Sequence, residues 1–246
     1  MKRLEDVKHH ETEDLYYPTM CKVTGAKQIT EMEKWYEIEM PNGQTLGHNP
    51  GQFVEVSAFG IGEAPISISS SPSKGSKFEL CIRQVGTLTN VLKNYEAGDM
   101  IGIRGPFGKG FPMEKLFGKD ILVVAGGIGL VPLRSLINYV LDNRKDFGRL
   151  IILYGAKTPS ELLFRDELEE WKNRDDVELH VTVDQADETW EGNTGVITTL
   201  IPSLDLKLNT TIAAITGPPI MYKFVVMSLK SKQLPDDQIY LSLERR

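Results

Sequence analysis

The sequence predicts two domains: an antiparallel β-barrel or sandwich over residues 1–115, then an α/β domain with a parallel sheet over residues 116–246. Two observations support this division. In the first part, short segments alternate apolar and polar residues with a period of two, which is typical of half-buried strands. In the second part, apolar strands alternate with helices, which indicates βαβ units and a parallel sheet. The pattern changes near residues 113–119, where we place the boundary.

The expected strands of the first domain lie beside glycine and proline turns. In residues 34–40, Tyr36, Ile38 and Met40 alternate with glutamates, and in residues 78–83 the apolar Phe78 and its period-two partners face away from Glu79, Cys81 and Arg83. Further strands are expected within 50–58, 62–69 and 98–108.

The second domain reads as strands and helices in turn. A buried strand at 121–127 precedes a helix over 132–145, with Pro132 suited to its first turn. A strand at 149–155 precedes a helix over 160–173, for which Ser160 is a candidate N-cap. The remaining expected elements are strands at 177–184 and 211–217, a helix at 218–230 and a last strand at 238–243.

Composition excludes several classes of protein. With 41% hydrophobic and 25% charged residues the chain is globular, and its net charge of −6 argues against a nucleic-acid surface. No apolar run approaches the ~20 residues of a membrane span, and the polar N-terminus has no signal-peptide core. Two cysteines, Cys21 and Cys81, match neither a zinc pattern nor a disulfide framework. We therefore expect a reducing, cytoplasmic location and no cysteine-ligated metal within the chain.

One loop of the second domain is suited to phosphate. The stretch LVVAGGIGLVPLRS runs from a strand through Gly126, Gly127 and Gly129 into a helix, whose first N–H groups and dipole favour an anion. A tight βα turn without a ligand is the alternative interpretation. The spacing is not the G-x-G-x-x-G fingerprint, since Pro132 stands where its third glycine would be.

A second loop has similar features. In RQVGTLTNVL, Gly86 ends a strand and Thr89 lies at the start of a short helix, where a hydroxyl and free amides would suit another phosphate. The alternative is that Thr89 is simply an N-cap.

The stretch GEAPISISSSP interleaves apolar residues with hydroxyls just before a turn, so it is either a binding edge or an ordinary strand edge. Together with the other motifs of the sequence, this stretch suggests a binding edge. The order PISIS, GTLTNVL, GPFG, VVAGGIGLVP, LYGAKTPSELLF and TGPPIMYKF resembles the ferredoxin–NADP reductase family over residues 15 to 243. The resemblance is strongest to electron-transfer subunits of dihydroorotate dehydrogenase, sulfhydrogenase (gamma) and anaerobic sulfite reductase (B). It implies a Greek-key barrel that binds FAD and a second domain that binds NAD(P)H.

The resemblance also implies the site. Ser67 would lie beside the reactive edge of the flavin, with Pro65, Ile66 and Ile68 presenting backbone groups to the ring. The FAD pyrophosphate would lie at Gly86, Thr87 and Thr89, and the nicotinamide nucleotide over Gly126, Gly127 and Gly129. The segment Gly217, Pro218 and Pro219 would bring the nicotinamide onto the flavin.

Three departures from the family pattern stand out. The family often has R-x-Y-S in the flavin strand, where this chain has Ala64 and Ile66, so Arg83 is a candidate replacement cation unless it is an ordinary surface arginine. Many members have cysteine where this chain has Thr216, whose hydroxyl can still contact the ring; with Ser67 it is the candidate catalytic residue. In the nearest branch a cysteine-rich [2Fe–2S] tail follows, whereas this sequence stops at Arg246, so either the tail lies beyond a truncation or this member lacks it.

The implied activity is that of an FAD-dependent NAD(P)H oxidoreductase subunit. Its electrons would pass to iron–sulfur centres of a partner subunit, in a hydrogenase, sulfite reductase or heterodisulfide-reductase type complex. The alternatives are a free-standing flavin or small-acceptor reductase and a non-catalytic flavin-binding assembly subunit. A 2′-phosphate would need positive charge, which Lys157 or Arg165 could supply, but no basic cluster is present and NAD(H) is favoured over NADP(H).

Overall fold

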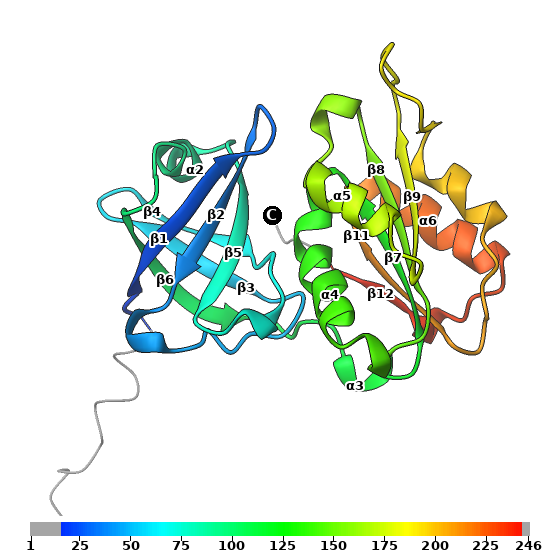
Figure 1. Cartoon of the computed structure of the whole chain (residues 1–246), viewed down its shortest axis with the longest axis horizontal. Coiled ribbons are helices and arrows are strands. Elements are labelled where there is room, and N and C mark those ends of the chain that lie inside the picture. The colour runs from blue at the N-terminus through cyan, green and yellow to red at the C-terminus, as the bar shows by residue number, and fades with distance from the viewer. Residues whose placement is uncertain (1–15, 243–246) are drawn as a thin grey trace, which may run out of the picture.

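The computed structural model describes residues 16–242, and its two halves stand side by side (Figure 1). The first half is a six-stranded antiparallel sheet in the order β4-β3-β6-β1-β2-β5. A bridge between Ile68 and Leu80 joins the end of β4 to β5 and so closes the sheet into a barrel. The strands are β1 (Thr19–Gln28), β2 (Glu33–Glu39), β3 (Phe53–Ala58), β4 (Gly62–Ser67), β5 (Lys77–Arg83) and β6 (Met100–Phe107).

The barrel core follows from the period-two pattern. Tyr36 and Ile38 of β2 and Phe78 of β5 point inward and are buried, as the alternation predicts. The short helix α2 (Thr87–Leu92) is tied to this core because the Tyr36 hydroxyl donates to the Leu92 carbonyl at 2.6 Å. The buried ammonium of Lys34 donates to the carbonyls of Lys93 and Tyr95 just beyond that helix.

The outer face of β5 is buried as well. Glu79 and Cys81 alternate with the core residues, as expected, yet they are only 2% and 3% exposed. Cys81 packs in the same cluster as the core of the second half, together with Ile29 and Trp35. The face that the pattern marks as polar is therefore the face on which the two halves meet.

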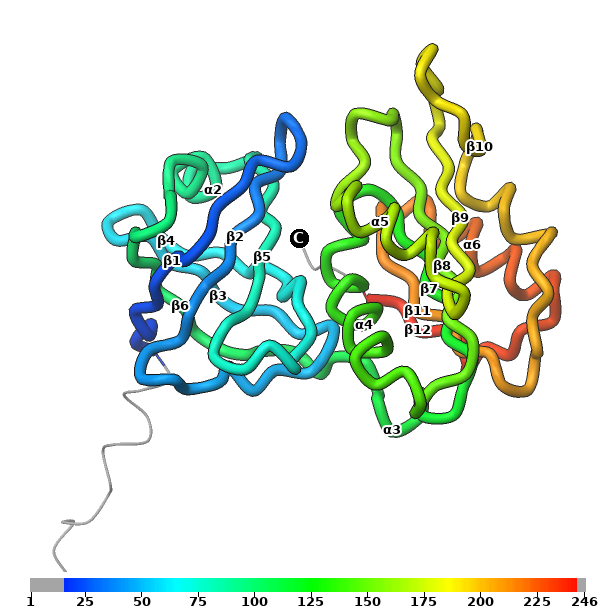
Figure 2. The backbone as a smooth tube through the Cα atoms, in the orientation of Figure 1, coloured from blue at the N-terminus to red at the C-terminus, as the bar shows by residue number. Residues whose placement is uncertain are grey.

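The second half is a six-stranded parallel sheet in the order β10-β9-β8-β7-β11-β12. Figure 2 traces its path from β7 through to β12. With the closed antiparallel sheet, it confirms the predicted fold class. The strands are β7 (Asp120–Gly126), β8 (Leu150–Ala156), β9 (Val177–Val183), β10 (Asn193–Thr194), β11 (Thr211–Thr216) and β12 (Ile239–Leu241); the helices are α3 (Met113–Leu116), α4 (Leu130–Asp142), α5 (Arg165–Lys172) and α6 (Pro219–Ser231).

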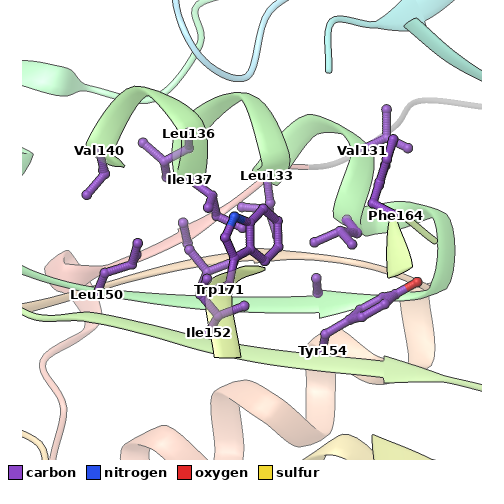
Figure 3. Packing of buried hydrophobic residues seen from close by; sticks show 14 of the residues in the cluster. Val131, Leu133, Leu136, Ile137, Val140, Leu150, Ile152, Tyr154, Phe164 and Trp171 are labelled. Carbon is purple, nitrogen blue, oxygen red and sulfur yellow. The ribbon is translucent and has the colours of Figure 1, made fainter. Parts of the chain in front are cut away.

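Helix α4 lies between the parallel sheet and the barrel (Figure 1). Its apolar side chains, among them Leu133 and Ile137, pack on Trp171 of α5 and on sheet residues such as Ile152 of β8 (Figure 3). Because α4 follows the glycine loop in the chain, the packing of α4 on the sheet determines where that loop lies. None of the helices within residues 16–242 is long and apolar enough to cross a membrane.

Several predicted bounds differ from the structure, and the largest difference is at one helix of the second half. The helix expected from Ser160 begins only at Arg165, because Phe164 adopts a left-handed backbone (φ 50°) and buries its ring. Ser160 is exposed and bonds to Thr158, so it is not the N-cap. The last strand ends at Leu241, and residue 243 lies outside the described residues. The boundary between residues 115 and 116 falls within α3 and stays a prediction.

Candidate functional site

The candidate nucleotide site lies at the carboxyl edge of the parallel sheet. Strand pairing sets Thr216 of β11 beside Ala125 of β7, and Gly126 of β7 beside Gly155 of β8. Three strand ends therefore meet at one edge, which is where ligands bind in open α/β sheets.

The glycines of the loop after β7 serve two different purposes. Gly127 has a φ of +55°, and a Cβ placed on it would meet nothing within 4 Å. A Cβ on Gly129 would lie 2.3 Å from the Thr216 carbonyl oxygen, and one on Gly126 would lie 2.5 Å from the Met221 Sδ. Gly126 and Gly129 thus allow close packing within the protein, while Gly127 leaves an open cradle at the start of α4. The ligand contact of all three stays a prediction.

Thr216 carries an unused hydroxyl at this edge. The residue is 3% exposed, and its Oγ1 has no hydrogen-bond partner among the described residues. An orphaned buried hydroxyl costs about 1–3 kcal/mol. The open backbone at Gly127 and the unused Thr216 hydroxyl both fit a bound nucleotide.

The turn after β11 is held in a fixed shape. The Gly217 amide donates to the Tyr222 hydroxyl at 3.2 Å, and that hydroxyl donates to the Ser242 carbonyl at 2.5 Å. Pro218 and Pro219 are exposed and begin α6. The predicted nicotinamide segment is therefore a rigid, accessible turn.

The predicted flavin strand is the end of β4. Ser67 is half-buried and pairs with Phe53 of β3, while Pro65 is exposed and Ile66 half-buried. The Ile68 side chain is fully buried in the barrel core, so only its backbone can face a ligand. Helix α2 lies against β3 and β4, which brings the second predicted phosphate loop near this strand.

The Thr89 hydroxyl forms its hydrogen bonds within its own turn. It accepts hydrogen bonds from the amides of Val85 (3.0 Å) and Gly86 (2.9 Å) and donates to the Gly86 carbonyl (3.2 Å). Thr89 is the third residue of α2, so it reaches back to the N-cap Gly86 and is not the N-cap itself. Gly86 and Thr87 are exposed, and their contact with a phosphate stays a prediction.

The candidate cations are already engaged or solvated. Arg83 is half-buried and forms an ion pair with the buried carboxylate of Glu33. Lys157 is exposed just beyond β8. Arg165 donates to the Pro159 carbonyl.

His9 and His10 lie outside the described residues, and the histidines and cysteines within residues 16–242 are engaged elsewhere. His48 is buried, with its Nε2 3.0 Å from the Ser70 carbonyl oxygen, and His180 contacts Glu178 within β9. The two cysteines are free and buried; burial raises the pKa of Cys21 to about 11 and raises the pKa of Cys81 further. Neither thiol is ionised at neutral pH.

A buried polar junction, which the sequence did not predict, connects the loop after the predicted flavin strand to helix α4, which follows the nucleotide loop. The Arg134 Nη1 of α4 lies 3.1 Å from both the carbonyl and the hydroxyl oxygen of Ser69, and 2.5 Å from the Glu79 Oε2. The next residue, Ser135, donates from its hydroxyl to the Ser70 carbonyl at 2.6 Å. The run of serines after Ser67 was the signal that could have pointed to it.

Electrostatics stabilise this junction in its charged form. Burial alone would raise the pKa of Glu79, but the charge of Arg134 and hydrogen bonds from Lys74 and Arg134 hold it below its ordinary range. Burial disfavours the Arg134 cation, yet its bonds and charge interactions with Glu167 and Glu79 raise the pKa of Arg134. Both groups are therefore charged at neutral pH.

Two family descriptions match the two halves of the chain. The oxidoreductase FAD-binding domain matches residues 20–111, and the oxidoreductase NAD-binding domain matches residues 123–227. The sulfhydrogenase 2 gamma subunit of Pyrococcus furiosus is 35% identical over 241 residues, covering 92% of this chain and 83% of the relative. The sulfhydrogenase 1 gamma subunit of the same organism is 38% identical, covering 92% and 79%. An electron transfer subunit of a probable dihydroorotate dehydrogenase B from Methanothermobacter thermautotrophicus is 36% identical, covering 80% and 66%.

Solved structures agree on the fold. The FAD/NAD-binding domain of a nitric oxide dioxygenase from Vibrio cholerae superposes with a TM-score of 0.81 at 15% identity, covering 92% of this chain and 98% of that one. A ferredoxin NADP⁺ reductase from Neisseria gonorrhoeae, solved with FAD and NADP, has a TM-score of 0.74 at 21% identity, covering 91% and 97%. At these identities the likeness concerns the fold alone.

Proposed function

This chain belongs to the ferredoxin–NADP reductase family of FAD- and NAD-binding oxidoreductases, and we propose that it passes electrons between NAD(H) and the iron–sulfur centres of a partner subunit. It is a flavoprotein oxidoreductase whose cofactors are FAD and NAD(H). The observation that carries the proposed role is that the two sulfhydrogenase relatives, both gamma subunits, each match 92% of this chain and both of its halves.

The chain's residues supply binding and orientation. The open space at Gly127 and the turn that leads into α4 would hold the phosphates of the nicotinamide nucleotide, since a helix start favours an anion. The Thr216 hydroxyl would bond to the nicotinamide, and the Gly217–Pro219 turn would direct that ring toward Ser67. Gly86 and Thr87 would hold the FAD pyrophosphate, and Arg83, which pairs with Glu33, stays the candidate cation.

The site needs orientation more than proton transfer. The chemistry that bound FAD supplies is exchange between two-electron nicotinamide chemistry and one-electron carriers. The role of Ser67 is to donate a hydrogen bond at the flavin edge, and that of the surrounding turns is to align the two rings and keep water out. We assign Ser67 and Thr216 as the residues that contact the reacting rings.

We also propose NAD(H) rather than NADP(H) as the preferred nucleotide. Lys157 is exposed and isolated, and Arg165 already donates to a carbonyl, so no preformed pocket for a 2′-phosphate is present among these residues. A cytoplasmic location is proposed from the two free, buried cysteines. For the domain division we propose residues 1–115 for FAD and 116–246 for the nucleotide.

The direct test is an anaerobic titration of the purified, FAD-loaded chain with NADH and then NADPH, following the visible absorption of the flavin. We expect bleaching of the flavin bands by NADH at lower concentration than by NADPH. A flavin indifferent to both nucleotides would contradict the proposal and favour a non-catalytic assembly subunit. Co-purification with a cluster-containing subunit supports the role in a complex, whereas a chain active alone on small acceptors would favour a free-standing reductase.

A further inference from the structure

We propose that Arg134 is a positioning residue, which fixes the nucleotide loop relative to the flavin strand so that the two bound rings meet in the orientation needed for electron transfer. The inference rests on the proposed function of the two sites. It concerns a residue that contacts neither of the predicted ligand positions.

The Arg134 side chain joins three parts of the molecule. Its Nη1 bonds to Ser69 and Glu79 of the barrel, and its Nε and Nη2 bond to the Glu167 carboxylate of α5 at 2.8 and 2.6 Å. Its guanidinium also lies 4.4 Å from the centre of the Phe164 ring. Each nitrogen of the group has a protein partner and the residue is only 5% exposed. Arg134 is therefore built to hold protein segments, not a ligand.

The barrel side of the junction is equally fixed. Ser69 and Ser70 are fully buried, and the Ser69 amide donates to the Glu79 carbonyl at 2.8 Å. The Ser70 hydroxyl accepts from the Glu79 amide at 2.9 Å, and its carbonyl accepts from Ser135 and contacts His48. The serine loop consequently has little freedom to move without breaking buried bonds.

The junction is close in sequence to both sites. Ser69 follows the predicted flavin residue Ser67 by two positions, and Arg134 lies one helical turn beyond Leu130, which begins α4 after the glycine loop. The path from one site to the other through the hydrogen bonds of the junction is therefore short. Because Arg134 lies in the first turns of α4, a shift of its side chain should also shift the glycine loop that precedes the helix.

The apolar part of the interface does not provide this precision. Cys81, Trp35 and Ile29 pack on the second half, but apolar contact is non-directional and tolerates sliding. The planar guanidinium of Arg134 donates in fixed directions, so its hydrogen bonds fit only one arrangement of the partner groups. Apolar burial thus holds the halves together, while Arg134 sets their orientation.

The test compares Arg134→Gln and Arg134→Lys with Arg144→Gln in the full FAD-loaded chain. Arg144 is a matched control, because its bonds to Asp176, Phe147 and Gly148 all lie within the second half. Rapid mixing with NADH gives the limiting rate of flavin reduction and, from its concentration dependence, the Kd of NADH. Hydrogen exchange is measured on the same chains without nucleotide, over residues 67–80 and 130–136.

We expect Arg134→Gln to lower the limiting rate by roughly 10- to 100-fold, the range expected for misplacement of about 1 Å, with the Kd of NADH changed less than about twofold. Hydrogen exchange should become faster at both segments. Arg134→Lys should have an intermediate limiting rate and exchange, because it keeps the charge without the planar guanidinium. Arg144→Gln should leave all readouts unchanged. If Arg134→Gln does not fold, Arg134→Lys and Ser135→Ala answer the same question.

Several results would overturn the inference. A limiting rate within about twofold of the original overturns it whatever the exchange shows. A Kd that rises in proportion to the loss of rate would make Arg134 a nucleotide-binding residue instead. If the unaltered chain is not reduced by NADH, the proposed function fails. Hydrogen exchange alone then decides whether Arg134 fixes the two segments. Faster exchange at both segments in Arg134→Gln supports the inference, and unchanged exchange overturns it.

Discussion

The guanidinium of Arg134 and the carboxylate of Glu79 form a buried ion pair, with Nη1 2.5 Å from Oε2, between residues that lie 55 positions apart in the sequence. One partner belongs to the helix that follows the nucleotide loop, and the other to the barrel strand behind the serine loop. Such a pair specifies an arrangement more than it adds stability, because desolvation offsets much of the attraction. Removing one partner destabilises the protein, since it leaves an uncompensated buried charge.

The Glu79 carboxylate should make the free energy of unfolding depend on pH in the acid range. Because its folded pKa lies below its ordinary value of 4.5, its contribution is fully present above that value and is lost as the pH falls through the lower folded pKa. Glu79→Gln should cost on the order of 3 kcal/mol of unfolding free energy at neutral pH and should weaken this acid dependence. Urea unfolding from neutral pH to about pH 3 measures both effects.

Glu63→Gln is the control for the acid prediction. The pKa of Glu63 is also lowered, chiefly by a hydrogen bond from Arg104, but its side chain is 43% exposed. A pair this accessible contributes less than about 1 kcal/mol. An acid profile equally altered by both substitutions would show that the buried junction has no special part in it.

Thr216→Val should separate nucleotide binding from stability. The unaltered hydroxyl has no partner among the described residues, so replacing it by a methyl group should raise the unfolding free energy of the nucleotide-free chain by about 1 kcal/mol. If the hydroxyl bonds to bound NADH, the Kd should rise by about 3- to 10-fold. Urea unfolding and NADH titration are the two measurements.

The same strand offers a matched control. Thr211 begins β11, is buried, and likewise has an unpartnered Oγ1, but it lies at the opposite end of the strand from the candidate site. Thr211→Val should give the same gain in stability with no change in NADH affinity. Equal losses of affinity in both variants would remove Thr216 from the site.

Local sequence patterns predicted the elements better than the contacts between them. The strand around Tyr36 follows from period-two alternation and the strand around Ile152 from a continuous apolar run, and both patterns are properties of neighbouring residues. The left-handed Phe164 shortened a predicted helix, because burial of its ring in the core outweighed local helix preference. The role of Thr89 likewise differed from a simple N-cap, although the sequence placed it correctly at the start of a helix.

The candidate site was predicted only in part for the same reason. Gly127 and Thr216 lie at strand ends, where the α/β pattern places ligands. Arg134 could not be found this way, because its partners Ser69 and Glu79 approach it only when the two halves dock. A polar residue on β5 looks like a solvent-facing residue until the neighbouring domain is present.

The glycines of the nucleotide loop should respond differently to substitution. Gly127→Ala should cost about 1 kcal/mol of stability through its positive φ, and it should weaken NADH binding because the methyl group enters the open cradle. Gly129→Ala should cost well over 2 kcal/mol, because its Cβ would meet backbone atoms of Thr216 and Gly217. Thermal unfolding with and without NADH measures both. A Gly127→Ala chain that binds NADH normally would place the phosphates elsewhere.

Thr89→Val tests whether the short helix α2 takes part in holding FAD. The hydroxyl makes three bonds to the backbone of residues 85 and 86, so its loss should cost about 1 kcal/mol and loosen the turn that presents Gly86 and Thr87. We expect the purified variant to retain less FAD, measured as the ratio of flavin to protein absorption. Thr89→Ser keeps the hydroxyl and should restore retention. Full flavin occupancy in Thr89→Val, together with the loss of stability, would restrict Thr89 to its structural role, because the turn would then have loosened without affecting the cofactor.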